Sequence, residues 1–130
     1  MLLVLPLALL LGAALAPVAP ALSWVPLINL LSFALLGGLV AIGWPLPPLA
    51  VVGLAAVFGL SHGYENGRAM TADVAAHLFV PGVALVGFMA AASMSAATLT
   101  LTARADWLRI GLRVAGSWIA AIGIMMIGLS

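Results

Sequence analysis

The chain has no cysteine and no lysine, and its 130 residues include only three acidic side chains, four arginines and two histidines. Without cysteine the protein can form neither a disulfide bond nor a metal site with thiolate ligands. Its formal net charge of +1 is too small for a nucleic-acid-binding surface, so we expect no nucleic-acid partner. Every basic position is arginine, whose side chain stays charged and can bridge a carboxylate or a lipid phosphate.

Apolar residues fill most of the chain: they make up 66% of it, charged residues make up 5%, and the mean hydropathy is +1.36. These values lie far outside the range of soluble globular proteins. Apolar runs recur along the whole length, each near the roughly 20 residues that cross a hydrocarbon core about 30 Å thick. No segment shows the alternation of a membrane β-strand. The composition therefore predicts an all-α fold, a polytopic transmembrane helical bundle in the lipid bilayer.

The interruptions between these runs predict about five membrane helices within a single transmembrane domain, residues 1–130. Their expected ranges are 2–16, 22–44, 48–65, 73–103 and 107–129. The first run could instead be a cleaved signal peptide, because it has that length and ends in small residues, although it lacks a positively charged start. The fourth run is longer than the hydrocarbon requires, so Pro81 and Gly82 predict a kink.

The distribution of arginine predicts the orientation of such a bundle. The loops after the third and the fourth helix face opposite compartments. Arg104, Arg109 and Arg113 flank the later loop, whereas Arg68 alone lies in the earlier one. The positive-inside rule therefore places the later loop in the cytoplasm, with the N-terminus inside and the C-terminus outside. We expect a multi-pass protein of the bacterial inner (cytoplasmic) membrane, in which Asp106, Arg109 and Arg113 form a salt-bridged anchor at the membrane surface.

Small residues gather where helices are expected to approach one another. They form the run AAASMSAAT at residues 90–98 and recur as Gly116 with Ala120 and as Ser117 with Ala121. Such residues let helix backbones come close together in a membrane. We therefore expect partners besides the lipid: a homo-oligomer, or a larger membrane complex assembled through these helix faces.

One window, GLSHGYENGRAMTADVAAH at residues 59–77, holds most of the ionisable side chains. His62 precedes Glu65 by three residues and Asp73 precedes His77 by four, spacings that place side chains on one face of a helix. If the third and fourth helices form an antiparallel hairpin, two imidazoles and two carboxylates meet at one end of the bundle. His62, Glu65, Asp73 and His77 are therefore candidate metal ligands, a donor set that suits Ni²⁺, Co²⁺ or Zn²⁺ better than magnesium or calcium.

A structural interpretation of the same window stays open. Asp73 can cap the fourth helix, Glu65 can pair with Arg68, and both histidines can hydrogen-bond to backbone at helix ends, so that the window is a clasp between two helices. No catalytic pattern is present: Ser61 beside His62 does not by itself bring the hydroxyl to the imidazole, and G-x-S-x-G, H-E-x-x-H and phosphate-loop motifs are missing. We expect neither an enzyme nor a firmly bound cofactor other than a transported or bound metal ion.

The stretch VFGLSHGYENGRA, residues 57–69, resembles a late helix motif of the HupE/UreJ family, approximately F-H-G-x-A-x-G-x-E. His62, Gly63 and Gly67 stand at the corresponding positions. The apolar runs around this stretch are similar to the last five helices of the family. The resemblance implies a nickel or cobalt permease, a hydrogenase or urease accessory membrane protein.

The chain departs from that family in two ways. Residues 1–45 contain no histidine or acid, so the family's metal-binding motif of the first helix is missing, as in a member shortened at its N-terminus. Ala69 replaces the motif's closing glutamate, and Glu65 stands where alanine is usual. Two functions therefore stay in view. One is movement or delivery of a divalent transition metal ion, with binding that weakens as pH falls through the usual histidine pKa of about 6.5. The other is a non-transporting accessory or structural subunit of a larger membrane complex.

Overall fold

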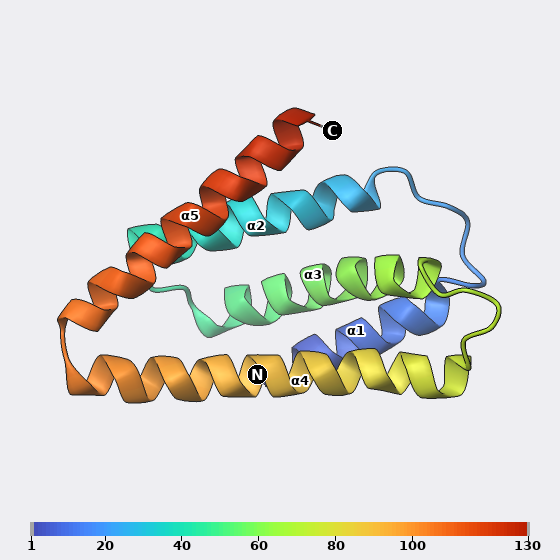
Figure 1. Cartoon of the computed structure of the whole chain (residues 1–130), viewed down its shortest axis with the longest axis horizontal. Helices are drawn as coiled ribbons and strands as arrows, with labels where there is room; N and C mark the ends of the chain where they lie inside the picture. Colours follow the sequence, from blue (N-terminus) through green and yellow to red (C-terminus); the bar gives the residue numbers. More distant parts are fainter. Residues whose placement is uncertain (1, 130) are drawn as a thin grey trace. The chain divides into compact units, whose positions relative to one another are not determined.

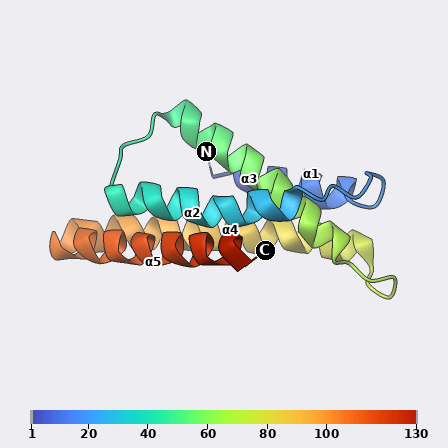
Figure 2. The same cartoon turned by 90° about the horizontal axis from the view of Figure 1, so that it is seen from above.

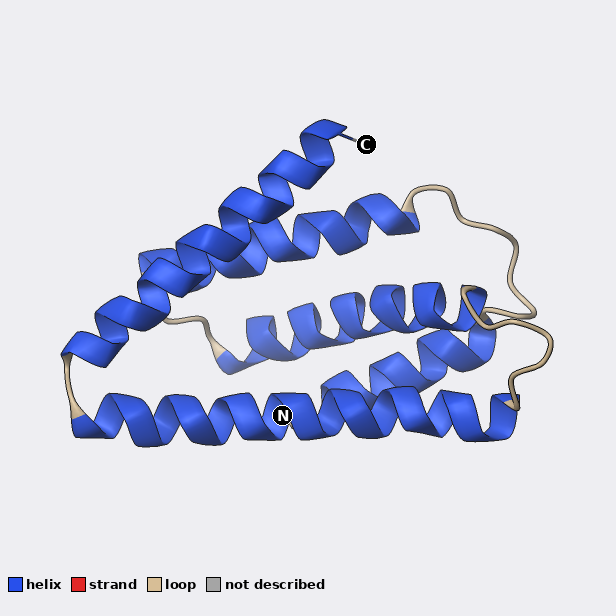
Figure 3. Cartoon of the chain, viewed as in Figure 1, coloured by secondary structure: helices blue, strands red, loops and turns tan. Residues whose placement is uncertain are grey.

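Residues 2–129 are described by a computed structural model, and within them every regular element is a helix (Figures 1 and 3). The elements are α1 (Val4–Leu15), α2 (Val25–Ile42), α3 (Pro48–Arg68), α4 (Ala76–Arg104) and α5 (Trp107–Leu129). These five helices, with no strand between residues 2 and 129, confirm the predicted all-α class.

The helix ends follow local signals that hydropathy does not carry. α2 ends where Gly43 has a φ of 71°, a left-handed conformation in which glycine closes a helix. α3 begins at Pro48, because the fixed φ of proline suits the first helical position, and it continues to Arg68, past its predicted end. α4 begins at Ala76 and not at Asp73 as predicted. The range of α5 is the predicted one.

Three of the helices, α2, α4 and α5, are long and apolar enough to cross a membrane. α1 is apolar but has 12 residues, which span about 18 Å at about 1.5 Å per residue, less than a full hydrocarbon core. α3 has a sufficient length of 21 residues, but the polar side chains on its C-terminal turns lower its mean hydropathy. α1 and α3 pack against each other.

α4 passes through Pro81 as one unbroken helix (Figure 1). Proline has no N–H to donate, so the carbonyl of His77, four residues earlier, loses its usual intrahelical partner. The predicted kink is therefore not a break in the helix. The loss of one backbone hydrogen bond near the start of a 29-residue helix leaves the remaining turns intact.

The chain divides into two compact units. Unit 1 comprises Met1–Pro26 and Pro47–Ser93, and unit 2 comprises Leu27–Leu46 and Met94–Ser130. The division falls inside α4, whose first half belongs to unit 1 and whose second half belongs to unit 2. The window of ionisable residues at 59–77, which we call the polar window, thus lies in unit 1. The loop between α4 and α5, with Arg104 and Arg109 beside it, lies in unit 2.

Glycines at every fourth position of α3 hold α1 close in unit 1. Gly59, Gly63 and Gly67 face α1: a Cβ on Gly63 would stand 2.8 Å from the carbonyl carbon of Leu9, and one on Gly67 would stand 2.5 Å from the carbonyl oxygen of Ala13. The contacts advance in the same direction along both helices, so α1 and α3 run parallel (Figure 1). Membrane helices approach this closely where small residues line the contact.

The first half of α4 completes unit 1 and runs antiparallel to α3, the arrangement that the shared site of the four candidate ligands requires (Figures 1 and 2). The Leu9 side chain of α1 reaches the backbone of α4 at Gly87, and Ala84 of α4 is buried. Residues 69–75 connect the end of α3 to the start of α4. This connection places the polar window at one end of the unit.

Unit 2 uses small residues in the same way, but in an antiparallel pair formed by α2 and α5. A Cβ on Gly37 would stand 2.5 Å from the amide nitrogen of Ala120, and one on Gly123 would stand 2.6 Å from the amide nitrogen of Ala34. Ala120, predicted to lie in a helix contact, therefore contacts α2 of the same chain. Residues 93–97, in the other predicted small-residue face, are exposed.

Arg113 joins the two helices of unit 2. Its Nε donates a hydrogen bond of 2.8 Å to the carbonyl oxygen of Ala41, which lies in the last turn of α2, where carbonyls lack an intrahelical partner. The predicted anchor is therefore corrected in part. Arg109 Nε lies 3.9 Å from a carboxylate oxygen of Asp106 at the exposed start of α5, whereas Arg113 caps the neighbouring helix.

Candidate functional site

The predicted metal ligands lie at one end of unit 1, where α3 ends and α4 begins (Figure 1). His62 and Glu65 stand on the last turns of α3 and are half-buried. Asp73, in the connection, and His77, in the first turn of α4, are exposed. The fold thus gathers the candidates at one end of the unit as two pairs that differ in exposure to the surroundings.

His62 lines a cavity of about 600 Å³ among α1, α3 and α4, which we call the histidine cavity. Most of the cavity wall is apolar, and its polar side chains are those of His62 and Asn66. The residues around the cavity are Leu9, His62, Asn66, Phe79, Gly82, Val83, Val86 and Gly87. An imidazole beside an apolar cavity can offer a ring nitrogen to a cation that has lost part of its water.

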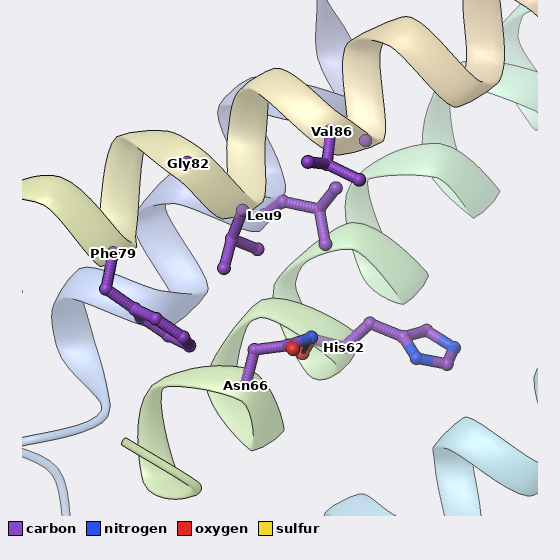
Figure 4. Close-up of a pocket in the computed structure, with 8 residues that line it drawn as sticks. Leu9, His62, Asn66, Phe79, Gly82 and Val86 are labelled. Atoms are coloured by element: carbon purple, nitrogen blue, oxygen red, sulfur yellow. Dashed lines mark hydrogen bonds between the residues drawn. The ribbon is translucent and has the colours of Figure 1, made fainter. Parts of the chain in front are cut away.

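Asn66 completes the polar part of this wall without offering its amide nitrogen to a ligand. Its Nδ2 donates a hydrogen bond of 2.8 Å to the backbone carbonyl oxygen of His62, one turn earlier on α3. In Figure 4 the ring of Phe79 extends from α4 toward α3, while the imidazole of His62 points away from both Phe79 and Asn66. His62 is therefore the side chain of the cavity wall that carries an imidazole, the group whose ring nitrogen could bind a metal ion.

Glu65 lines a different pocket, of about 420 Å³, although it lies only three residues beyond His62. That pocket, which we call the end pocket, is formed by Ala21, Leu22, Ser23, Tyr64, Glu65, Arg68 and Ala69. The separation follows from the neighbouring segments. Residues of α4 lie beside His62 and Asn66, whereas residues 21–23 lie beside Tyr64, Glu65 and Arg68.

Asp73 lies in a turn outside α4, so the prediction that Asp73 and His77 share one helix face is wrong. A hydrogen bond from the Thr71 side chain, with a further one from the backbone of Asp73 itself, holds the pKa of the Asp73 carboxyl below its usual value. Short polar side chains that bond locally in this way favour turns over helices. The start of α4 is delayed to Ala76 for that reason.

Between residues 2 and 129, no three histidine, aspartate or glutamate side chains lie close enough together to hold one metal ion. The four candidates occupy one end of unit 1 but do not form a closed coordination shell in this conformation. A structural zinc site, by comparison, closes around its ion with four protein ligands.

Two residues of this region carry interactions that the sequence interpretation missed. The hydroxyl of buried Tyr64 donates a hydrogen bond to the carbonyl oxygen of Pro20, which ties the segment after α1 to the end of α3. Tyr64 is the only tyrosine of the chain, and it lies 44 residues after the proline-rich connection. These two features were the only indications of the bond in the sequence. Ser61 donates its hydroxyl to the carbonyl oxygen of Phe58, within its own helix.

Three apolar spanning helices, an all-helical fold and a polar window at the end of one unit define the class: this is a helical membrane protein. The family model described as HupE / UreJ protein matches residues 1–126, nearly the whole chain, and the protein therefore belongs to the HupE/UreJ family. No curated protein and no solved structure matches the chain.

Proposed function

We propose that the protein moves or delivers a divalent transition metal ion, Ni²⁺ or Co²⁺ in the first place and Zn²⁺ in the second. The observation that carries the proposal is the half-buried imidazole of His62 beside a largely apolar cavity. Imidazole nitrogen is a preferred ligand of these ions, whereas magnesium and calcium prefer oxygen. Membership in the HupE/UreJ family supports the same interpretation.

His62, Glu65, Asp73 and His77 are the proposed ligands, used in succession and not as one shell. Asp73 and His77 are exposed and would meet the ion first, and His62 and Glu65 are half-buried and would receive it. An ion that is passed on has to bind weakly enough at each point to leave again. An open, divided ligand set suits such a cargo better than a closed tetrahedral site does.

The helix directions support the orientation that we propose. In unit 1, α1 runs parallel to α3 and antiparallel to the first half of α4, and in unit 2, α2 runs antiparallel to α5. These directions fit a chain whose successive helices cross in alternate senses. With Arg104, Arg109 and Arg113 around the cytoplasmic loop, the N-terminus lies inside, the C-terminus outside and the histidine window outside a bacterial inner membrane.

The alternative proposal is a non-transporting accessory subunit of a larger membrane complex. It is favoured by the exposed small-residue stretch at 93–97, which is suited to a neighbouring helix, and by the open ligand set. In either role we propose no enzymatic activity: the hydroxyl of Ser61, next to His62, is bound to its own helix.

Metal titration of the detergent-solubilised chain tests the proposal. Ni²⁺, Co²⁺ and Zn²⁺ are titrated separately into the wild type, a His62→Ala, His77→Ala double variant and an Asp106→Asn control, which removes an exposed carboxylate of unit 2. We expect micromolar binding that the double variant loses and the control keeps. Equal, weak binding by all three proteins would reject metal handling and favour the accessory subunit.

A further inference from the structure

One wall of the end pocket belongs to the packed interior of unit 1. Tyr64 is buried in a small core with Ala16 and Val25, and its hydroxyl is bonded to the carbonyl oxygen of Pro20. This bond holds residues 21–23, which form one side of the pocket, against the last turns of α3, which form the other. The pocket therefore lies between two segments that a hydrogen bond holds together.

Opposite charges line this pocket without neutralising each other. Glu65 and Arg68 are three residues apart on α3, a spacing at which the two side chains could pair. They do not: between residues 2 and 129 the ion pair of the structure is that of Asp106 with Arg109. A carboxylate and a guanidinium thus line one pocket of about 420 Å³. A ligand with both charges could place its cationic group on the carboxylate and its anionic group on the guanidinium.

The position of the pocket indicates where such a ligand comes from. It lies at the polar end of α3, and the nearby Trp24 is 54% exposed, as expected for an aromatic ring at the boundary of a bilayer. Phospholipid headgroups occupy this depth. Arginine binds phosphate through paired N–H donors, and an ammonium group has three N–H donors for a carboxylate.

We propose that the end pocket binds the phosphoethanolamine headgroup of a phospholipid, with its phosphate on Arg68 and its ammonium group on Glu65. The geometry gives a selectivity. A choline headgroup carries no N–H to donate to Glu65, and a glycerol headgroup brings no cation to it. Phosphatidylethanolamine is therefore preferred over phosphatidylcholine and phosphatidylglycerol. Glu65 is also a proposed metal ligand, so the two proposals share one carboxylate. Arg68 is outside the proposed metal ligands, and its loss should therefore affect the headgroup site without affecting metal handling.

Native mass spectrometry of the full chain in detergent tests the proposal, with short-chain phosphatidylethanolamine, phosphatidylcholine, phosphatidylglycerol and free phosphoethanolamine titrated separately. We expect phosphatidylethanolamine to bind the wild type about tenfold more tightly than the other two lipids, the size of one charge-assisted hydrogen bond. Arg68→Gln should lose that binding, and Glu65→Gln should reduce it to the level of phosphatidylcholine. Arg104→Gln and Asp106→Asn are the matched controls and should change nothing.

Equal binding of the three lipids, or full retention of binding by Arg68→Gln, would overturn the proposal. Free phosphoethanolamine that binds as tightly as the lipid would overturn the lipid as its source and assign the pocket to a soluble zwitterion. Arg68→Gln should also keep its helix content and its Ni²⁺ affinity. A variant that retains both while losing the lipid shows loss of the headgroup site and not of the fold.

Discussion

Units 1 and 2 both pack their helices through small residues, but they differ in the charged and polar side chains that they carry. Both units bring two backbones together over glycine and alanine, in parallel in unit 1 and antiparallel in unit 2. Unit 1 then carries both histidines and two of the three acids, whereas unit 2 carries three of the four arginines. Close packing is therefore not itself the functional signal. The polar residues beside the packed helices distinguish the unit that we propose to bind ligands from the unit that we propose to set the orientation in the membrane.

The largest effects are expected when a side chain is placed into the close helix contact of each unit, between α1 and α3 or between α2 and α5. Gly63→Val and Gly116→Val each put a Cβ about where backbone already stands, 2.8 Å from the carbonyl carbon of Leu9 and 2.8 Å from the amide nitrogen of Ala41. We expect each to lower the free energy of unfolding by about 1–3 kcal/mol or more, measured by thermal unfolding in detergent. Only Gly63→Val should also weaken Ni²⁺ binding.

Gly53→Ala is the control for these two variants, because a Cβ at Gly53 meets no atom within 4 Å. Alanine also favours the helix over glycine by up to about 1 kcal/mol, so this variant should be as stable as the wild type or slightly more stable. Loss of Ni²⁺ binding in Gly116→Val would show that the two units cannot be separated functionally.

A smaller and more local effect is expected from His62→Ala alone. The substitution removes the principal proposed ligand of the histidine cavity but no packing contact of the glycine seam. Ni²⁺ affinity should fall at least about tenfold, equivalent to about 1.4 kcal/mol, with an unchanged unfolding temperature. Isothermal titration calorimetry measures the first quantity and circular dichroism the second. A fall in stability without a change in affinity would make His62 a structural residue.

Arg113→Gln tests the corresponding cap in unit 2. It removes the charged donor of the 2.8 Å hydrogen bond to Ala41, and the exposed setting limits the expected loss of unfolding free energy to about 1 kcal/mol. Arg109→Gln removes only an exposed ion pair with Asp106 and should cost about 0–0.5 kcal/mol. Thermal unfolding of the two variants side by side checks the order, and equal losses would contradict the capping role.

The smallest effect concerns the turn before α4. Hydrogen bonds from Thr71 and from its own backbone keep the pKa of Asp73 below the usual 3.8. A lowered pKa means that the turn gains stability from the ionised carboxylate above that usual value and loses it as pH falls through the lower folded value. Carboxyl carbon chemical shifts should show this lowered pKa, and Thr71→Val should raise it. An unchanged titration in Thr71→Val would contradict the bond.

The class of the protein and most of its helix positions followed from the sequence, because apolar length and proline or glycine breaks are local properties. The start of α4 did not, since Asp73 bonds to its own turn in competition with the helix. The role of Arg113 depends on a carbonyl that lies 72 residues earlier in the chain, which no local pattern reports. The bond from Tyr64 to Pro20 also joins residues that are far apart in sequence, by 44 positions.

For the candidate site, the sequence predicted which residues gather at one end of unit 1 but not how they divide. His62 and Glu65 stand at a spacing that suggested one shared face, yet they line separate pockets on α3. The division is set by tertiary contacts, because α4 lies beside His62 and residues 21–23 lie beside Glu65, with α1 packed on the glycines of α3. The glycines that contact α1 lie within the same window, at residues 59, 63 and 67, but glycine has no side chain that could bind a metal ion.

The contact of the three α3 glycines with α1 also determines the direction in which the remaining side chains leave α3. Successive residues of a helix are rotated by about 100°, so docking Gly59, Gly63 and Gly67 against α1 fixes the angle at which His62 leaves the helix axis. The three glycines fix the rotation of α3 against α1, and this rotation determines the direction of the His62 side chain. A single-residue insertion between Gly59 and His62 would rotate His62, Gly63 and Gly67 together by about 100° relative to Gly59, so that the three glycines could no longer contact α1 along one face of α3.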